Sequence, residues 1–193
     1  MNKEQITGII LAGGQNLRMG TNKAFISWNG RLLIDWVHEA LKPICSELIV
    51  SANEGDFSHL DVRVIPDRFK KIGPVGGIES SLSASNTKYN IIVSCDTPLL
   101  STEFFQYMLK QHQQYEISIP IHEGIIEPMI GVYNTSVLDK FQEAIANNQY
   151  KPPQIIKSCD YQEVGITENL NFYQPDLFLN LNKPEDLKPE KYG

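Results

Sequence analysis

The sequence contains little cysteine and no long apolar run. Its three cysteines, Cys45, Cys95 and Cys159, are widely spaced and form no CxxC pair. A disulfide framework or a structural zinc site is therefore not expected. The apolar stretch before Gly13 is only a few residues long, whereas a secretory h-region is longer and a membrane-spanning helix needs about 20 apolar residues. We expect a cytoplasmic protein that does not cross or bind a membrane.

An excess of positive charge is also lacking. The chain has 17 Lys and Arg residues against 23 Asp and Glu residues, which gives a formal net charge of -6. Broad binding to nucleic acid requires a cationic surface, so a nucleic-acid partner is not expected. The 193 residues, of which 41% are hydrophobic and 21% charged, suit an ordinary globular protein. We see no internal repeat and no linker, so residues 1–193 are expected to form a single domain.

The first part of the chain alternates between strand-like and helical patterns. Short segments rich in β-branched residues, at 6–12, 47–53, 62–66 and 90–96, predict strands. Helical spacing of apolar residues within 31–45, and helix-like segments at 76–85 and 101–114, predict helices. This alternation is typical of an α/β protein with a three-layer, Rossmann-like fold and a mostly parallel sheet.

The pattern changes after about residue 114. The segments 116–122 and 127–133 predict strands joined through a turn at Gly124, which indicates a mixed-sheet insertion in the C-terminal half. A helix is expected near 136–147, a proline-containing loop at 147–154, and a short strand with a capped turn at 178–187. The chain therefore divides into a first half, about 1–114, and a second half, about 115–193.

A glycine-rich loop follows the first predicted strand, in the string LAGGQNLRMGTNK (11–23). Glycines allow a close approach of the backbone to a ligand, and their N–H groups can bind phosphate oxygens. Arg18 and Lys23 would then offset phosphate charge. The loop is not a Walker A motif, because Thr21 and Asn22 separate Lys23 from Gly20, and it has no G-x-G-x-x-G fingerprint. A glycine turn with two solvated cations is the simpler alternative.

Asp96 ends the apolar segment NIIVSCD, at the edge where open parallel sheets bind ligands. Mg²⁺ is commonly held by one or two carboxylates together with substrate phosphates. We therefore interpret Asp96 as a metal ligand, the alternative being a residue that caps a turn. Asp67 and Asn53 also follow predicted strands, and both suit turns as well as ligand contacts.

The ordered set of motifs resembles the MobA-like nucleotidyltransferases, and specifically the molybdenum cofactor guanylyltransferases. The motifs are LAGG-x3-RMG-x2-K, PDRFKKIGPVGGI (66–78), SCDTPLL (94–100) and NLNKPEDL (180–187). The resemblance implies that GMP is transferred from GTP to molybdopterin carrying molybdenum, with release of pyrophosphate. It also implies Mg²⁺ as cofactor, and possible contacts with molybdoenzyme apoproteins or other cofactor-assembly proteins.

The resemblance further implies a set of site residues. The first half would bind GTP and the second half molybdopterin. Lys23, Arg18 and Asp96 would be catalytic, with Asp96 on the metal. The residues implied in substrate binding are Leu11, Ala12, Gly13, Gly14, Lys23, Asn53, Asp67, Asp96, Asn180 and Asn182. The family pattern often has an arginine near the pterin, where this chain offers Lys151 and Lys157.

Two other hypotheses about the function remain open. One is a related nucleotidyltransferase that uses CTP or a sugar phosphate, although CTP-using relatives tend to carry Ala-Ala-Gly where this chain has Ala12-Gly13-Gly14. The other is a nucleotide-binding adaptor without catalysis. Such an adaptor has no evident need for both Lys23 and Asp96.

Overall fold

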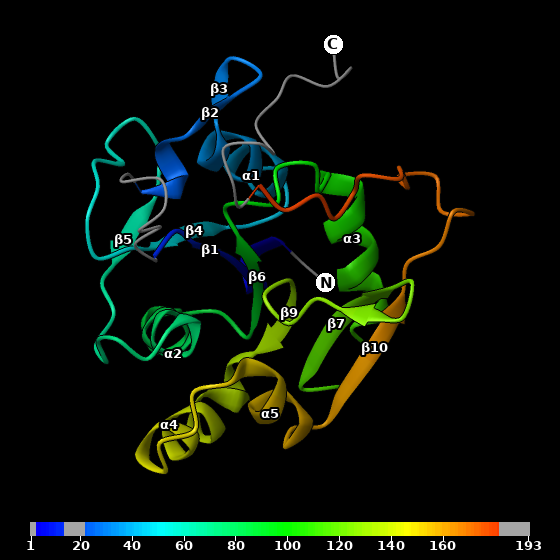
Figure 1. The fold of residues 1–193 in the computed structure, drawn as a ribbon. Helices are drawn as coiled ribbons and strands as arrows, with labels where there is room; N and C mark the ends of the chain where they lie inside the picture. Colours follow the sequence, from blue (N-terminus) through cyan, green and yellow to red (C-terminus); the bar gives the residue numbers. More distant parts are fainter. Residues whose placement is uncertain (1–2, 14–21, 182–193) are drawn as a thin grey trace.

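A computed structural model of the chain describes residues 3–13 and 22–181 (Figure 1). Within these ranges, eight strands form one sheet with the order β10-β7-β9-β6-β1-β4-β5, and β8 pairs with β7. The strands of this sheet are β1 (Ile6–Leu11), β4 (Glu47–Ser51), β5 (Arg63–Ile65), β6 (Tyr89–Ser94), β7 (Ile117–His122), β8 (Ile125–Ile126), β9 (Gly131–Asn134) and β10 (Tyr161–Gly165). A separate hairpin consists of β2 (Ser27–Trp28) and β3 (Arg31–Leu32).

The sheet is mostly parallel, as predicted. β1 lies between β4 and β6 and is parallel to both, and β5 continues the parallel order beyond β4. The exception is β9, which is antiparallel to its neighbours β6 and β7. Because β9 reverses direction between them, β7 points the same way as β6. The carboxyl ends of β1, β4, β5, β6 and β7 therefore meet at one edge of the sheet.

Helices cover both faces of the sheet (Figure 1). They are α1 (Leu33–Leu41), α2 (Pro74–Ala84), α3 (Thr102–Gln111), α4 (Leu138–Ala146) and α5 (Pro152–Lys157). α1 and α3 pack with one set of strand residues, and α2, α4 and α5 pack with the other. None of these helices combines the length and apolar character needed to cross a membrane.

Side chains of β1 point alternately to the two faces of the sheet, and both faces are covered by helices. Ile10 belongs to the apolar cluster under α1 and α3, whereas its neighbour Ile9 belongs to the cluster under α2 and α4. Successive strand residues point to opposite faces, so a strand covered on both sides is apolar throughout. All six residues of β1 are buried, which agrees with the three-layer arrangement predicted from the alternation of strands and helices.

The sequence predictions differ from the structure mainly at element ends. β4 ends at Ser51 and β6 at Ser94, so Asn53 and Asp96 lie in the loops beyond the strands rather than inside them. Residues 152–154, predicted as loop, are the first turn of α5. Residues 178–181 form no strand, and 182–187 lie outside the described ranges. The turn at Gly124 is correct, and it joins β7 to the two-residue strand β8.

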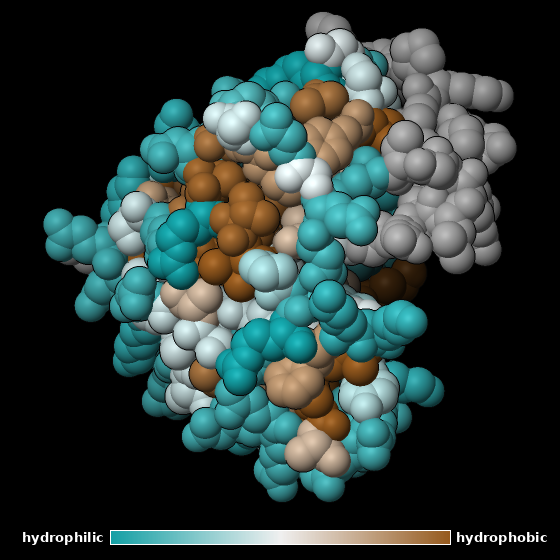
Figure 2. Space-filling model, turned by 90° about the vertical axis from the view of Figure 1, so that its left-hand side faces the viewer, coloured by the Kyte–Doolittle hydropathy of each residue, from teal (hydrophilic) through white to brown (hydrophobic). Residues whose placement is uncertain are grey.

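The edge strand β5 carries exposed apolar surface. Val64 in β5 is 44% exposed, and Phe69 in the loop after it is 37% exposed. Figure 2 shows this side of the molecule, where hydrophobic surface is bordered by hydrophilic residues. An exposed edge strand is a potential site for pairing with another chain, and keeping it short limits that pairing. β5 has three residues.

A buried polar group joins the end of α3 to β7 and β10. His112, the C-cap of α3, is fully buried, and its Nδ1 lies 2.7 Å from Ser118 Oγ on β7. Gln162 of β10 donates to the same hydroxyl at 2.8 Å. Burial, with a smaller contribution from Lys88, lowers the pKa of His112 from 6.5 to about 4. The imidazole is therefore neutral in the folded protein near neutral pH.

The lowered pKa predicts a loss of stability in acid. The unfolded chain binds the proton near pH 6.5, whereas the folded protein binds it only near pH 4. The contribution of neutral His112 to the free energy of unfolding is thus complete above about pH 6.5. It is lost as the pH falls toward 4, by up to about 3 kcal/mol. Urea unfolding at several pH values should show that the difference between wild type and His112→Gln shrinks over this window. Parallel pH profiles would contradict the prediction.

Candidate functional site

The carboxyl ends of β1, β4 and β6 are joined by backbone hydrogen bonds. The N–H of Ala12 donates to the carbonyl of Ser51 at 3.0 Å, and the N–H of Cys95 donates to the carbonyl of Leu11 at 3.1 Å. Leu11 and Ala12 are buried, whereas Gly13 is exposed. A Cβ added at Gly13 would lie 3.6 Å from the carbonyl oxygen of Ser51, an ordinary contact. Gly13 is therefore the first exposed residue after β1.

Lys23 and Asp96 form an ion pair at this edge. Lys23 Nζ donates to Asp96 Oδ2 at 2.8 Å, although the two residues are 73 positions apart. The local structure fixes Lys23, because the side-chain oxygen of Asn22 caps the short helix that begins there by accepting from Ala24 N at 3.0 Å. The Asn22 amide also donates to the carbonyl of Glu54 at 3.2 Å. The two predicted catalytic residues in the described ranges are thus brought together.

Asp96 retains one carboxylate oxygen for another partner. Its Oδ1 is buried and accepts no hydrogen bond within residues 3–13 and 22–181. In the same ranges, no cluster of three or more His, Cys, Asp or Glu side chains is arranged to hold a metal ion. Mg²⁺ does not need such a cluster when a nucleotide supplies phosphate oxygens. An orphaned carboxylate oxygen at the ligand-binding edge fits a metal that arrives with its substrate.

Asn53 and Asp67 bind each other. The Asn53 amide donates to Asp67 Oδ2 at 3.0 Å, and the N–H of Asp67 donates to Asn53 Oδ1 at 3.0 Å. Ser51 Oγ lies within hydrogen-bonding reach of Asp67 Oδ1, at 3.4 Å. These contacts tie the ends of β4 and β5 together and leave both side chains at the same strand edge as Asp96.

The C-terminal segment reaches the site through its backbone. The N–H of Leu181 donates to the carbonyl of Asp96 at 2.9 Å, and the preceding residue, Asn180, is exposed. Asn180 therefore directly precedes a residue whose backbone contacts Asp96. Gly14, Arg18 and Asn182 lie outside the described residues.

The thiol beside Asp96 is not a nucleophile. Cys95 is buried, and its burial, reinforced by the charge of Asp96, raises the pKa of the thiol to about 12. Only the thiolate attacks electrophiles efficiently. Cys95 therefore packs as a small apolar side chain, as its sequence context indicates.

One acidic residue near the site was not singled out from the sequence. Glu127 lies in the segment that leads into β9, and its N–H donates to the carbonyl of Pro120 at 3.1 Å. Partial burial raises the pKa of Glu127, the charge of Asp96 raises it further, and His122 lowers it. Because β9 starts at the carboxyl edge, Glu127 lies between the ends of β6 and β7. In the sequence, Glu127 is marked only by being an acidic residue that precedes a short strand.

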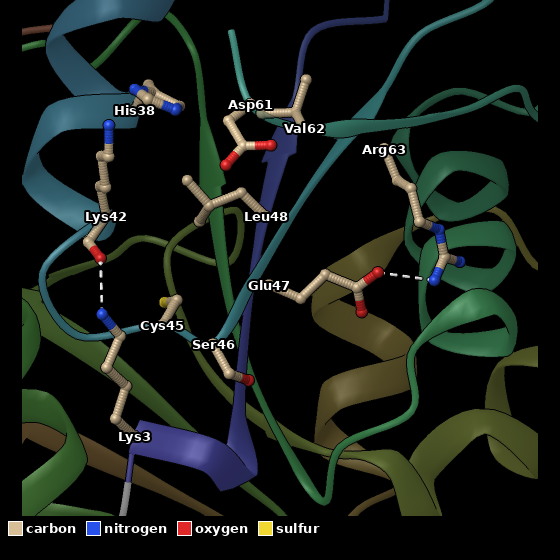
Figure 3. A pocket seen from close by; sticks show the side chains of 10 residues that line it. All are labelled: Lys3, His38, Lys42, Cys45, Ser46, Glu47, Leu48, Asp61, Val62 and Arg63. Atoms are coloured by element: carbon tan, nitrogen blue, oxygen red, sulfur yellow. Dashed lines mark hydrogen bonds and ion pairs between the residues drawn. The ribbon is translucent and has the colours of Figure 1, made fainter.

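A cavity of about 410 Å³ lies at the opposite edge of the sheet (Figure 3). Its lining includes His38 and Lys42 at the end of α1, and Glu47 and Arg63 at the amino ends of β4 and β5. This position separates it from Asp96 by the length of the strands. We do not assign it to the candidate site.

Comparison with known proteins gives a consistent result. The profile of the family described as MobA-like NTP transferase domain matches residues 8–163. A probable molybdenum cofactor guanylyltransferase of Flavobacterium johnsoniae is 30% identical over 95% of this chain and 95% of its own length. One of Carboxydothermus hydrogenoformans is 32% identical over 95% and 93%. The crystal structure of molybdopterin-guanine dinucleotide biosynthesis protein A of Archaeoglobus fulgidus shares the fold, with a TM-score of 0.80, 23% identity, and coverage of 94% and 95%.

Proposed function

The chain belongs to the MobA-like NTP transferase family, and from this premise we propose that it transfers GMP from GTP to molybdenum-molybdopterin. The products are pyrophosphate and molybdopterin guanine dinucleotide. The observation that carries the proposal is the Lys23–Asp96 pair, because Asp96 lies at the carboxyl ends of the adjacent parallel strands β1 and β6. A nucleotide-binding adaptor would not need this arrangement of charge.

We propose that the first half, about 1–114, binds GTP. The backbone from Leu11 to Gly13, in which Gly13 is the exposed residue, would lie along the nucleotide, with Gly14 completing the turn. Asn53 and Asp67 would contact the guanosine part, since both have polar atoms at the same edge. Arg18 and Lys23 would bind the triphosphate, where their charges offset those of the phosphates.

In the proposed reaction, an oxygen of the terminal phosphate of molybdopterin attacks the α-phosphorus of GTP. A new P–O bond forms as the bond between the α-phosphorus and the bridging oxygen breaks, and the electron pair leaves with pyrophosphate. Lys23 offsets the charge that develops on the transferring group. The chain supplies positioning and electrostatics, so no side-chain nucleophile takes part.

We propose Asp96 as the residue that holds Mg²⁺, through the oxygen that Lys23 does not bind. A bound Mg²⁺ would neutralise phosphate charge and orient the phosphates of GTP. Asp96 itself contributes the negative charge that attracts the ion and, in its absence, balances Lys23.

The second half, about 115–193, is proposed to bind molybdopterin. We propose that Asn180 and Asn182 belong to this side, and the contact between Leu181 and Asp96 supports a position for Asn180 next to the reacting groups. Lys151 and Lys157, at the two ends of α5, are exposed. The cytoplasm is the proposed location. Apoproteins of molybdoenzymes would then receive the product.

Release of pyrophosphate is the direct test. Purified protein with GTP, Mg²⁺ and molybdenum-molybdopterin should release pyrophosphate and form the dinucleotide, and omission of the acceptor should abolish both. GTP binding without turnover would favour the adaptor. Turnover with CTP or a sugar phosphate in place of the expected substrates would favour the related nucleotidyltransferase.

Base choice gives a separate prediction. At about 100 times its Kd, GTP should stabilise the protein by about 2.7 kcal/mol, or roughly 5–10 °C in Tm. The same concentration of CTP should give much less. Gly13→Ala should weaken GTP binding while leaving the ligand-free Tm unchanged, because the added Cβ makes only an ordinary contact within the protein. Equal protection by CTP and GTP in thermal unfolding would move the assignment to a CTP-using relative.

A further inference from the structure

A fully buried carboxylate lies outside the site described above. Glu79 of α2 has no exposed surface, and its Oε1 accepts hydrogen bonds from Arg68 Nη1 at 3.2 Å and from Gln142 Nε2 of α4 at 3.0 Å. Its Oε2 accepts from Ser80 Oγ at 3.3 Å. Burying a carboxylate costs several kcal/mol, and apolar residues of similar volume often stabilise a protein equally well or better. Packing alone therefore does not account for a charge at this position.

The partner of Glu79 is the residue after Asp67. Arg68 is held to α2 by its backbone, through its N–H and Ser80 Oγ at 2.9 Å, and by its side chain. The guanidinium bonds Glu79 and also donates to Ser83 Oγ at 3.1 Å. The loop that leaves β5 is thus fixed to α2 immediately behind Asp67.

Asp67 is confined from the other side by the end of β4. Asn53 binds its carboxylate and its N–H, and Ser51 lies against the second carboxylate oxygen. Gly77 of α2 closes the third side. A Cβ there would come within 2.5 Å of Ser51 Oγ and 3.4 Å of Asp67 Oδ1. The carboxylate of Asp67 therefore has little room to move as long as α2 and the loop after β5 keep their relative positions.

We infer that Glu79 is a positioning residue of the nucleotide site, which acts through Arg68 to fix the carboxylate of Asp67 where it meets the nucleoside. This inference rests on the proposed function, because it takes Asp67 as a contact of guanosine. The pair joins a fully buried carboxylate to a guanidinium whose side chain is 55% exposed, and it defines one position for the loop. An apolar pair would hold the loop less specifically. A displacement of the order of 1 Å is enough to weaken a positioned contact strongly.

A double substitution separates positioning from stability. Arg68→Met alone leaves the charge of Glu79 buried without its cation, so the Tm should fall. Arg68→Met combined with Glu79→Leu removes both charges and should bring the Tm back to about the wild-type value. We expect this double variant to bind GTP about tenfold more weakly in calorimetry with Mg²⁺ present, the scale for loss of a supporting contact. The KM for GTP should rise more than kcat falls.

Glu79→Gln keeps the shape and loses only the charge, so it provides a second, conservative variant. It should weaken GTP binding in the same direction and by less. The matched control is the pair Arg63–Glu47, 2.6 Å apart, at the amino ends of the same two strands (Figure 3). Arg63→Met with Glu47→Leu should leave the Kd for GTP unchanged, because this pair lies at the opposite edge of the sheet.

The outcomes are distinguishable. A double variant with restored Tm and wild-type affinity for GTP would overturn the positioning role and leave the proposed function intact. Asp67→Asn with wild-type affinity would remove the contact through which Glu79 is proposed to act, and the inference with it. If the wild-type protein does not bind GTP at all, the proposed function itself fails.

Discussion

Replacing Asp96 with asparagine is expected to lower turnover by about 10³-fold, the effect of losing several kcal/mol of transition-state stabilisation. The substitution keeps the shape of the side chain and removes the charge proposed to hold Mg²⁺. In the ligand-free protein the cost is small. Asp96 is buried, and its Oδ1 is unpaired within the part of the chain that the structure describes, so a neutral group relieves part of the cost of burying its charge. The Tm should therefore stay the same or rise.

The measurement is steady-state release of pyrophosphate across a titration of Mg²⁺, beside thermal unfolding without ligand. Asp35→Asn is the matched control, because Asp35 is a half-buried residue of α1 that pairs with His59. This control should retain full activity. If Asp96→Asn works within a few-fold of wild type at saturating Mg²⁺, Asp96 has no part in the mechanism.

The second large effect is expected at Lys23. Lys23→Ala should reduce kcat by about 10²-fold or more, the scale for loss of one preorganised stabilising group. The Kd for GTP should change less, because backbone and base contacts carry much of the ground-state binding. Lys23→Arg should restore only part of the rate, since a planar guanidinium does not occupy the position of a compact ammonium beside Asp96.

Single-turnover kinetics beside a GTP titration separate the two roles of Lys23. Lys110→Ala, at an exposed position of α3, removes the same charge away from the site and should change neither constant. A Lys23→Ala protein that binds GTP far more weakly and yet performs the chemical step at the normal rate would show that Lys23 only binds substrate. Lys23 also neutralises Asp96 in the free protein, so the Tm of this variant should be recorded.

Periodicity predicted the N-terminal half of the fold well. β1 and β6 are buried on both faces, and each contains a run of three apolar residues, Ile9–Leu11 and Ile91–Val93. β10 gave no such signal, because Val164 is its only buried residue. α5 was missed because Pro152 and Pro153 resemble a loop, although proline is well tolerated in the first turn of a helix.

The candidate site could be predicted where a residue follows a strand. Parallel topology brings strand ends to one edge, so Asp96 was expected near the loop that follows β1, and the ion pair between Lys23 and Asp96 agrees with that expectation. The support of Asp67 by Ser51, Gly77 and Glu79 was not predictable. It depends on how α2 packs against the end of β4, and no local pattern in GGIESS encodes that contact.

The reversed strand β9 also constrains the order in which the chain folds. β1, β4, β5 and β6 are complete once residue 94 has been made, and they pair with one another. β7 is made next, yet β9 separates it from β6 in the sheet, so β7 has no place there until residues 131–134 exist. Chains fold from the N-terminus during synthesis at about 5–20 residues per second. On the ribosome, the sheet formed by β1, β4, β5 and β6 therefore waits about a few seconds with the edge of β6 unpaired, and an unpaired edge can pair with another chain.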